Sequence, residues 1–209
     1  MALLALGVAL LPAAVAPTAP QAPPPWSRLP EAVAADSMLS MLAELGDIAV
    51  AGGFGEGRPS RSIRVRGHNM TADYIQELLE GRTDFSVEQQ WFLAKGDRLG
   101  EEEHWVSNVL VRTNRGDPTR RVLVGAHFDS VDEGPGLNDN GSGVVGLLEL
   151  ALRYHELGLG DLAANELTFG FWGAEEFGLL GSKHYVEQAA ASGELADLAL
   201  TVNLDMIAS

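Results

Sequence analysis

The 209-residue chain contains no cysteine. A disulfide framework, a thiolate zinc site and a cysteine nucleophile are therefore excluded, and any metal would have to be held by histidine and carboxylate side chains. Basic residues are scarce, because 14 lysines and arginines stand against 29 aspartates and glutamates, which gives a net charge of -15. This excess of scattered acids argues against nucleic acid and anionic membranes as partners. It favours metal cations or substrates that carry a positive charge.

The chain also lacks an apolar run long enough to cross a bilayer. The apolar start, MALLALGVALLPAAVA, ends near Ala16 before a proline-rich stretch, whereas a transmembrane helix needs about 20 apolar residues. Small residues at Ala14 and Ala16 suit cleavage of a signal peptide, although the usual basic start is missing. We therefore predict residues 1–25 to be a signal peptide or an Ala/Pro-rich leader, residues 26–209 to form one domain, and the protein to be secreted or extracellular.

Two common hydrolase motifs are missing. His155 and Glu156 begin like the zincin motif H-E-x-x-H, but Leu159 occupies the position of the second histidine. No serine lies in a G-x-S-x-G motif, which excludes the usual nucleophile turn of α/β-hydrolases.

The sequence after the leader alternates between helix and strand patterns. The run RRVLVGAH is continuously apolar after its first residues, as expected of a central strand that is covered on both faces. In NMTADYIQELLEG we expect a helix with a capping-type start and a buried stripe of Tyr74, Leu78 and Leu79. The expected helices are 36–50, 69–81, 141–157 and 178–192, and the expected strands are 85–94, 104–114, 120–127, 166–174 and 198–207. This order predicts an α/β fold, a three-layer α/β/α arrangement with a mostly parallel or mixed central sheet.

Imidazole and carboxylate groups follow three successive strands of this predicted sheet. His127 and Asp129 come at the end of the strand RRVLVGAH, Glu175 and Glu176 follow ELTFGFWGA, and Asp205 follows LALTVNL. In an open α/β sheet, ligands bind outside the carboxyl ends of the strands. We therefore expect these side chains to meet on one rim.

A further acid, Asp139, lies in the polar loop GAHFDSVDEGPGLNDNGSG, at the start of the next predicted helix. There an anionic side chain can cap backbone N–H groups and still project toward the strand ends. One histidine and several carboxylates on one rim suit two zinc ions about 3.5 to 4 Å apart with a carboxylate between them. Each residue alone could equally be a turn residue or part of a solvated helix start, but turn chemistry does not explain why all of them follow strand ends.

The glycines of the same loop fit another pattern. Gly141, Gly143 and Gly146 match G-x-G-x-x-G, the dinucleotide fingerprint. That fingerprint lies directly after a strand, whereas here the polar residues 128–140 intervene, and Asp139 would repel a pyrophosphate. Dinucleotide binding is therefore the weaker interpretation.

These residues resemble a known family, the secreted di-zinc aminopeptidases of metallopeptidase clan MH, of the bacterial leucyl aminopeptidase type. The resemblance runs from about residue 50 to residue 209, through GRPSRS, SNVLV, VGAHFDSV, GPGLNDNGSG, FWGAEEFGLLGS and NLDMI in this order. It implies a zinc-dependent exopeptidase fold over residues 26–209 and a substrate that is a peptide with a free N-terminus. It also implies a monomer that binds neither nucleic acid nor membrane.

The resemblance implies specific roles for the acidic rim. His127 and Asp205 would bind one zinc ion, Glu176 the other, and Asp139 would bridge the two. Asp129 would accept a hydrogen bond from the imidazole of His127.

The remaining acid, Glu175, would act as the general base. It would take the proton of a zinc-held water and pass it to the leaving amine.

The chain departs from the family pattern at its end. The family continues after the strand at 198–207 with a histidine for the second zinc and a tyrosine that stabilises the tetrahedral intermediate. We therefore expect a domain that is incomplete after Asp205, with an unpaired or uncovered sheet edge. Three alternatives stay open: an inactive or non-catalytic relative of the same fold, a carboxypeptidase, and a glutaminyl cyclase.

Overall fold

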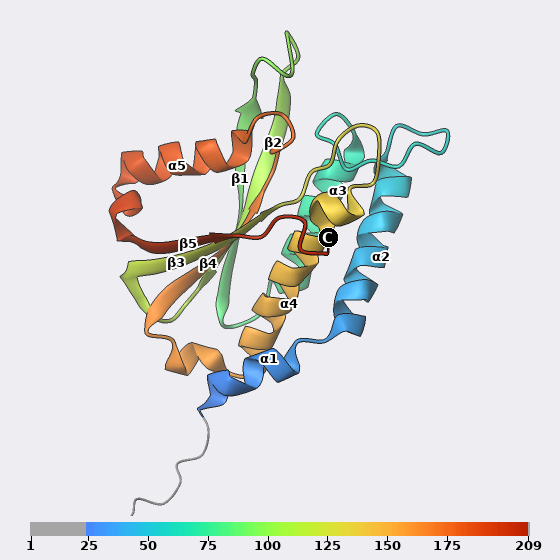
Figure 1. Cartoon of the computed structure of the whole chain (residues 1–209). Helices are drawn as coiled ribbons and strands as arrows, with labels where there is room; N and C mark the ends of the chain where they lie inside the picture. Colours follow the sequence, from blue (N-terminus) through green and yellow to red (C-terminus); the bar gives the residue numbers. More distant parts are fainter. Residues whose placement is uncertain (1–23, 209) are drawn as a thin grey trace, which may run out of the picture.

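The computed structural model describes residues 24–208, so the predicted leader lies almost wholly outside the described part (Figure 1). Most predicted elements are present, because local patterns and tertiary burial agree along most of the chain. In chain order they are α1 Leu29–Ala32, α2 Ala35–Gly52, α3 Arg66–Leu79, β1 Phe85–Ala94, β2 His104–Thr113, β3 Asp117–His127, α4 Gly143–Glu156, β4 Asn165–Trp172, α5 Leu180–Ser192 and β5 Leu198–Asn203. Short helical turns lie at Pro25–Arg28, Leu137–Ser142, Leu159–Leu162 and Glu194–Asp197.

The central sheet is mixed. Its five strands lie in the order β1-β2-β4-β3-β5. The pairs β1/β2 and β2/β4 are antiparallel, whereas β3 pairs in parallel with both β4 and β5. Burial of both faces of β3 explains its continuous apolar run, since Ala126 packs in the core that contains α4 and Leu123 packs against α5. The predicted α/β class with a mixed sheet is confirmed.

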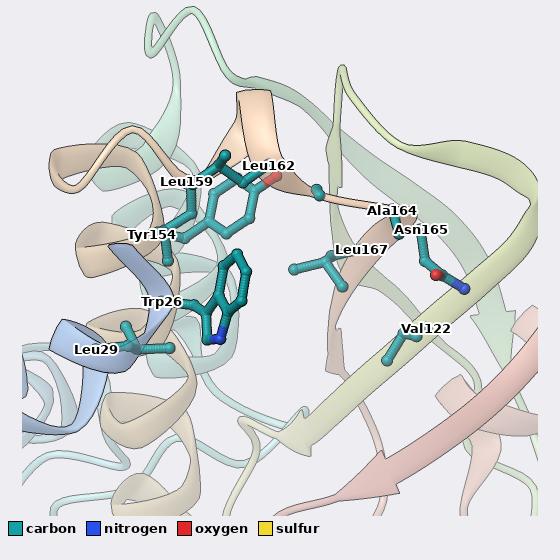
Figure 2. Close-up of a pocket in the computed structure, with 10 residues that line it drawn as sticks. Trp26, Leu29, Val122, Tyr154, Leu159, Leu162, Ala164, Asn165 and Leu167 are labelled. Carbon is teal, nitrogen blue, oxygen red and sulfur yellow. The ribbon is translucent and has the colours of Figure 1, made fainter. Parts of the chain in front are cut away.

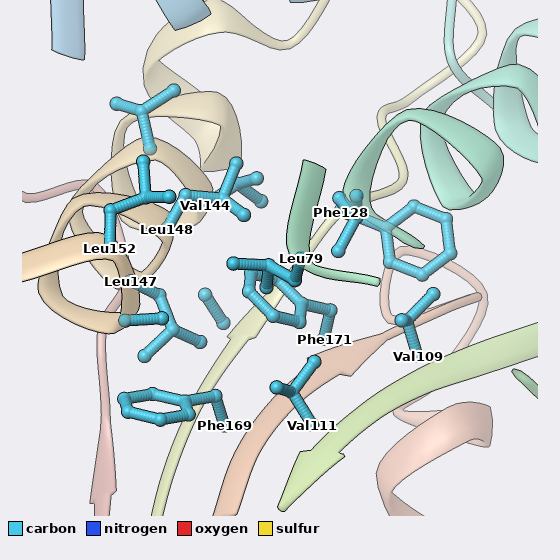
Figure 3. Close-up of a cluster of buried hydrophobic side chains, with 14 of the residues drawn as sticks. Leu79, Val109, Val111, Phe128, Val144, Leu147, Leu148, Leu152, Phe169 and Phe171 are labelled. Atoms are coloured by element: carbon cyan, nitrogen blue, oxygen red, sulfur yellow. The ribbon is translucent and has the colours of Figure 1, made fainter. Parts of the chain in front are cut away.

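Helices cover both faces of the sheet. Figure 1 shows α2, α3 and α4 on one side and α5 on the other. Alternate strand residues face the two layers, as the pleat requires. On the α3/α4 side, side chains of β2 and β4 pack against α4 in the main core drawn in Figure 3, which includes Val109, Val111, Phe169, Phe171, Leu147 and Leu148. On the α5 side, Leu110, Leu123 and Trp172 pack with Tyr185 and Ala189.

The helix α3 differs from its prediction in two respects. It begins at Arg66, before the expected start, and no side chain caps its first turn. Its buried residues are Gly67, His68, Thr71, Ala72, Ile75 and Leu79, so of the predicted stripe only Leu79 is fully buried. The expected capping start was wrong because tertiary packing of Gly67 and His68 extends the helix backward.

The strand β5 lies at one edge of the sheet. It pairs with β3 and with no second strand among the described residues. Its side chains are largely exposed, including Leu200 at 55% and Val202 at 40%. In residues 24–208, no helix is both long and apolar enough to cross a membrane.

Candidate metal centre

The parallel strands β3, β4 and β5 end on the same edge of the sheet, and this brings the predicted ligands together. His127 is the last residue of β3 and is 2% exposed. Its Nε2 atom lies 3.2 Å from Asp139 Oδ1, 3.7 Å from Asp205 Oδ1 and 3.9 Å from Glu175 Oε2. One imidazole nitrogen therefore faces three carboxylates from three different segments.

Three of these side chains have the spacing of metal ligands. One ligand atom each from His127, Asp139 and Glu176 lies within 4.8 Å of the others. Ligand atoms about 2.0 Å from a tetrahedral zinc ion are about 3.3 Å apart, which is close to the 3.2 Å between His127 and Asp139. Glu176 Oε1 is buried and has no hydrogen-bond partner among the described residues. A neutral imidazole with carboxylates suits zinc, so the donor set fits this ion.

Asp129 lies behind the imidazole. It is fully buried, and its Oδ1 is 3.5 Å from Nδ1 of His127. The two oxygens also accept hydrogen bonds from the backbone N–H groups of Glu175 and Glu176, at 2.9 and 3.2 Å. Asp129 thus connects the histidine at the end of β3 with the turn after β4. Its place beside the imidazole was expected from the family resemblance, whereas its bonds to the turn were not.

The electrostatics of the cluster favour a bound cation. Burial opposes protonation of His127, but the carboxylates of Asp129, Glu175 and Asp205 outweigh burial and raise its pKa to about 9. Burial and the neighbouring aspartates raise the pKa of Glu176 to about 7. Without a cation, the cluster therefore holds protons near neutral pH. A metal ion needs the deprotonated forms, so its binding would release these protons.

The loop between β3 and α4 corrects one prediction. Asp139 does not cap α4, since the helix begins at Gly143 and Asp139 has extended dihedral angles of φ -103° and ψ 100°. The capping contact comes from Asn140, whose Oδ1 accepts a hydrogen bond from the backbone N–H of Gly143 at 3.0 Å. Asp139 is therefore free to point into the cluster.

Asn140 also connects Asp139 with the segment of Asp205. Its amide donates to Leu204 O at 2.8 Å, and its Oδ1 accepts from the N–H of Met206 at 3.1 Å. The side chain is fully buried. The only sequence signal for this role is that asparagine often caps helices.

Two cavities differ in chemistry. The one at the cluster has a volume of about 170 Å³ and is lined by His127, Trp172, Glu175, Leu179, Ser182, Asn203 and Asp205. A larger one, of about 390 Å³, lies where β4 begins (Figure 2). Its walls come from Trp26, Leu29, Tyr154 and other mainly apolar residues, with no carboxylate or imidazole. The smaller cavity is therefore the one lined by imidazole and carboxylate groups.

Sequence comparison matches residues 108–209 to peptidase family M28. The probable lipoprotein aminopeptidase LpqL of Mycobacterium tuberculosis is 50% identical over 102 residues, which are 49% of this chain and 20% of that protein. Leupeptin-inactivating enzyme 1 of Streptomyces exfoliatus is 36% identical over 200 residues, 95% of this chain and 41% of that protein. The chain therefore spans less than half the length of these relatives.

Solved structures share the fold. The LapA aminopeptidase of Legionella pneumophila superposes with a TM-score of 0.64 at 24% identity, over 86% of this chain and 44% of that one. A Zn-dependent exopeptidase from Parabacteroides distasonis gives a TM-score of 0.65 at 20% identity, over 84% and 62%. The glutaminyl cyclase of an Acidobacteriales bacterium also gives 0.65, at 18% identity over 93% and 63%. At these identities the likeness concerns the fold alone.

Proposed function

Through residues 108–209 the chain belongs to peptidase family M28, and from this premise we propose that it is a zinc-dependent aminopeptidase that removes N-terminal residues from peptides. The observation that carries the proposal is the convergence of ligand atoms from His127, Asp139 and Glu176 within 4.8 Å, beside a further carboxylate at Glu175. The names of the aminopeptidase relatives support the substrate class.

We propose that these residues hold two zinc ions. His127 and Asp205 would bind one ion, Glu176 would bind the other, and Asp139 would lie between them. When bound, zinc lowers the pKa of water toward neutrality and polarises a peptide carbonyl. Asp129 would keep Nε2 of His127 aimed at the ligand position, because its carboxylate faces the opposite ring nitrogen at 3.5 Å.

Glu175 is the proposed proton carrier. It lines the cavity and lies 3.9 Å from His127 Nε2, but it is not one of the three clustered ligands. Burial and neighbouring carboxylates raise its pKa above the ordinary value, which suits a group that accepts a proton and then returns it. Its carboxylate would take the proton of the attacking water and deliver it to the leaving amine.

The acidic rim provides a reason for N-terminal specificity. The side chains of Asp139, Asp205 and Glu175 are 50%, 47% and 30% exposed, so part of each carboxylate faces the solvent. A substrate with a free α-amino group carries a positive charge at this position, and the rim would attract it. An internal peptide bond offers no such charge.

The decisive experiment measures bound zinc and the release of leucine from a leucyl anilide by this chain. The variant Glu175→Gln should keep the metal and lose activity by roughly 10²- to 10⁴-fold, since it can no longer accept a proton. Glu187→Gln, on the exposed surface of α5, is the matched control and should behave as the wild type. A wild-type chain that binds no zinc, or activity that persists in Glu175→Gln, would show that the proposal is wrong.

A glutaminyl cyclase is the second candidate, because proteins of that name share the fold. Both activities act on a substrate with a free N-terminus. Mass spectrometry of a peptide with N-terminal glutamine distinguishes the two activities. Cyclisation only releases ammonia and keeps every residue, whereas an aminopeptidase removes the N-terminal residue. A cyclised product without released amino acids would favour the cyclase.

Secretion is a further proposal, which rests on the apolar start and the small residues before residue 25. N-terminal sequencing of the exported protein tests it. Retention of the first residues on a protein found only inside the cell would contradict it.

A further inference from the structure

Arg61 is a buried cation close to the acidic cluster. It is 0% exposed, and none of the carboxylates of residues 24–208 forms an ion pair with it. Burial lowers its pKa to about 10, so the guanidinium is charged at neutral pH, and the charges of Asp129 and Asp139 favour this form. A buried charge is costly unless its hydrogen-bonding groups are satisfied. The hydrogen-bond partners of the guanidinium therefore indicate the role of Arg61.

All three nitrogens of the guanidinium donate to backbone carbonyls of one loop. Nε donates to Pro135 O at 2.8 Å, Nη2 to Gly136 O at 2.6 Å, and Nη1 to Phe128 O. The backbone N–H of Arg61 adds a bond to Ser130 Oγ at 2.9 Å. One side chain thus fastens both ends of the loop 128–136.

This loop lies between the ligands of the metal centre. It starts directly after His127, contains Asp129 and ends three residues before Asp139. Gly136 has a positive φ of 62°, and a Cβ atom there would lie 3.0 Å from Arg61 Nη2 and 2.5 Å from Asp139 O. The guanidinium therefore packs against the part of the loop that leads into Asp139.

We propose that Arg61 is a positioning residue of the metal centre, which sets the spacing of Asp129 and Asp139 relative to His127 by holding the loop carbonyls. The inference rests on the proposed function. It concerns a residue outside 108–209, the part of the chain matched to the peptidase family. Three carbonyls at different points need a planar fork of donors, which arginine has and lysine lacks.

The test uses Arg61→Lys and cobalt as a spectroscopic substitute for zinc. The visible absorption of bound Co²⁺ reports ligand geometry, and competition with a chelator gives the affinity. We expect the affinity to fall roughly 10- to 100-fold, the usual loss when a group that orients metal ligands is removed, together with an altered spectrum.

Arg64→Lys is the matched control. Arg64 binds the same loop through Asp132 at 2.8 Å, but its side chain is 28% exposed and it also pairs with Glu102. Because exposed ion pairs contribute little, its Co²⁺ affinity should stay within about twofold of the wild type. Ile75→Val, a mild core change in α3, controls for lost stability and should leave the spectrum unchanged.

The outcomes separate the two proposals. A wild-type chain without Co²⁺ or Zn²⁺ binding refutes the proposed function. Wild-type binding with an unchanged affinity and spectrum in Arg61→Lys refutes the positioning role. If the lysine variant does not fold, Arg61→Gln replaces it, since a neutral amide is easier to bury than an unpaired ammonium. An unchanged affinity in Arg61→Gln would overturn the inference equally.

Discussion

Replacing Asn140 with alanine should destabilise the protein, because this side chain connects the segment of Asp139 with the segment of Asp205. The change removes three hydrogen bonds. The side-chain amide of Asn140 donates one to Leu204 O, and its Oδ1 accepts the other two from the backbone N–H groups of Gly143 and Met206. Each such bond contributes about 1 kcal/mol, and buried groups that lose a partner cost more. The Gly143 bond is fully buried and the other two are partly buried, so we expect a total loss of about 2–3 kcal/mol in the free energy of unfolding.

Urea unfolding of the metal-free protein, followed by circular dichroism, measures this loss. In a thermal scan of the same protein, a loss of this size should lower the melting temperature by roughly 5–10 °C, as expected for a domain of about 200 residues. Asn114→Ala is the control, because Asn114 is exposed and donates a single side-chain bond, to Thr83 O, so its loss should be below about 0.5 kcal/mol. If the two variants lose the same stability, Asn140 does not hold the segments together.

Two further predictions concern charge and packing. In chelator-treated protein, thermal stability should fall as the pH rises from about 7 to about 9, because the folded state raises the pKa of Glu176 from 4.5 to about 7 and that of His127 from 6.5 to about 9. Below this range His68 acts in the opposite direction, since burial lowers its pKa from 6.5 to about 4. Glu176 and His127 hold protons in the folded state that the unfolded chain releases at lower pH, so a flat or rising profile would contradict the described electrostatics. Gly125→Ala should cost about 1–3 kcal/mol in urea unfolding, since a Cβ atom there would lie 2.4 Å from Trp172 Nε1. Gly134→Ala, with no atom within 4 Å of the added group, should be nearly neutral, and an equal cost for both would refute the packing argument.

Much of the fold follows from local sequence patterns. The predicted strand 85–94 coincides with β1, and the apolar run before His127 is the inner strand β3. Periodicity is a strong signal where an element buries one whole face or two. The strand order β1-β2-β4-β3-β5 is not predictable in this way, because it depends on contacts between distant segments.

The sequence predicts those site residues that lie at or just after the ends of strands. His127, Glu176 and Asp205 follow neighbouring parallel strands, and this alone brings them to one edge. Arg61 and Asn140 carry no such signal. Apart from the local bond between Asn140 and the N–H of Gly143, their roles come from hydrogen bonds to backbone groups that are between 64 and 75 positions away in the sequence. No local pattern reveals the identity of those distant groups.

The contacts of Arg61 also bear on where the protein can be cut. The family match begins at residue 108, inside β2 His104–Thr113 and after the segment that holds Arg61. A recombinant fragment of residues 108–209 would lack β1, the first four residues of β2 and the guanidinium that binds Phe128 O and Gly136 O. The homology boundary is therefore not a folding boundary, and expression fragments should begin ahead of residue 60.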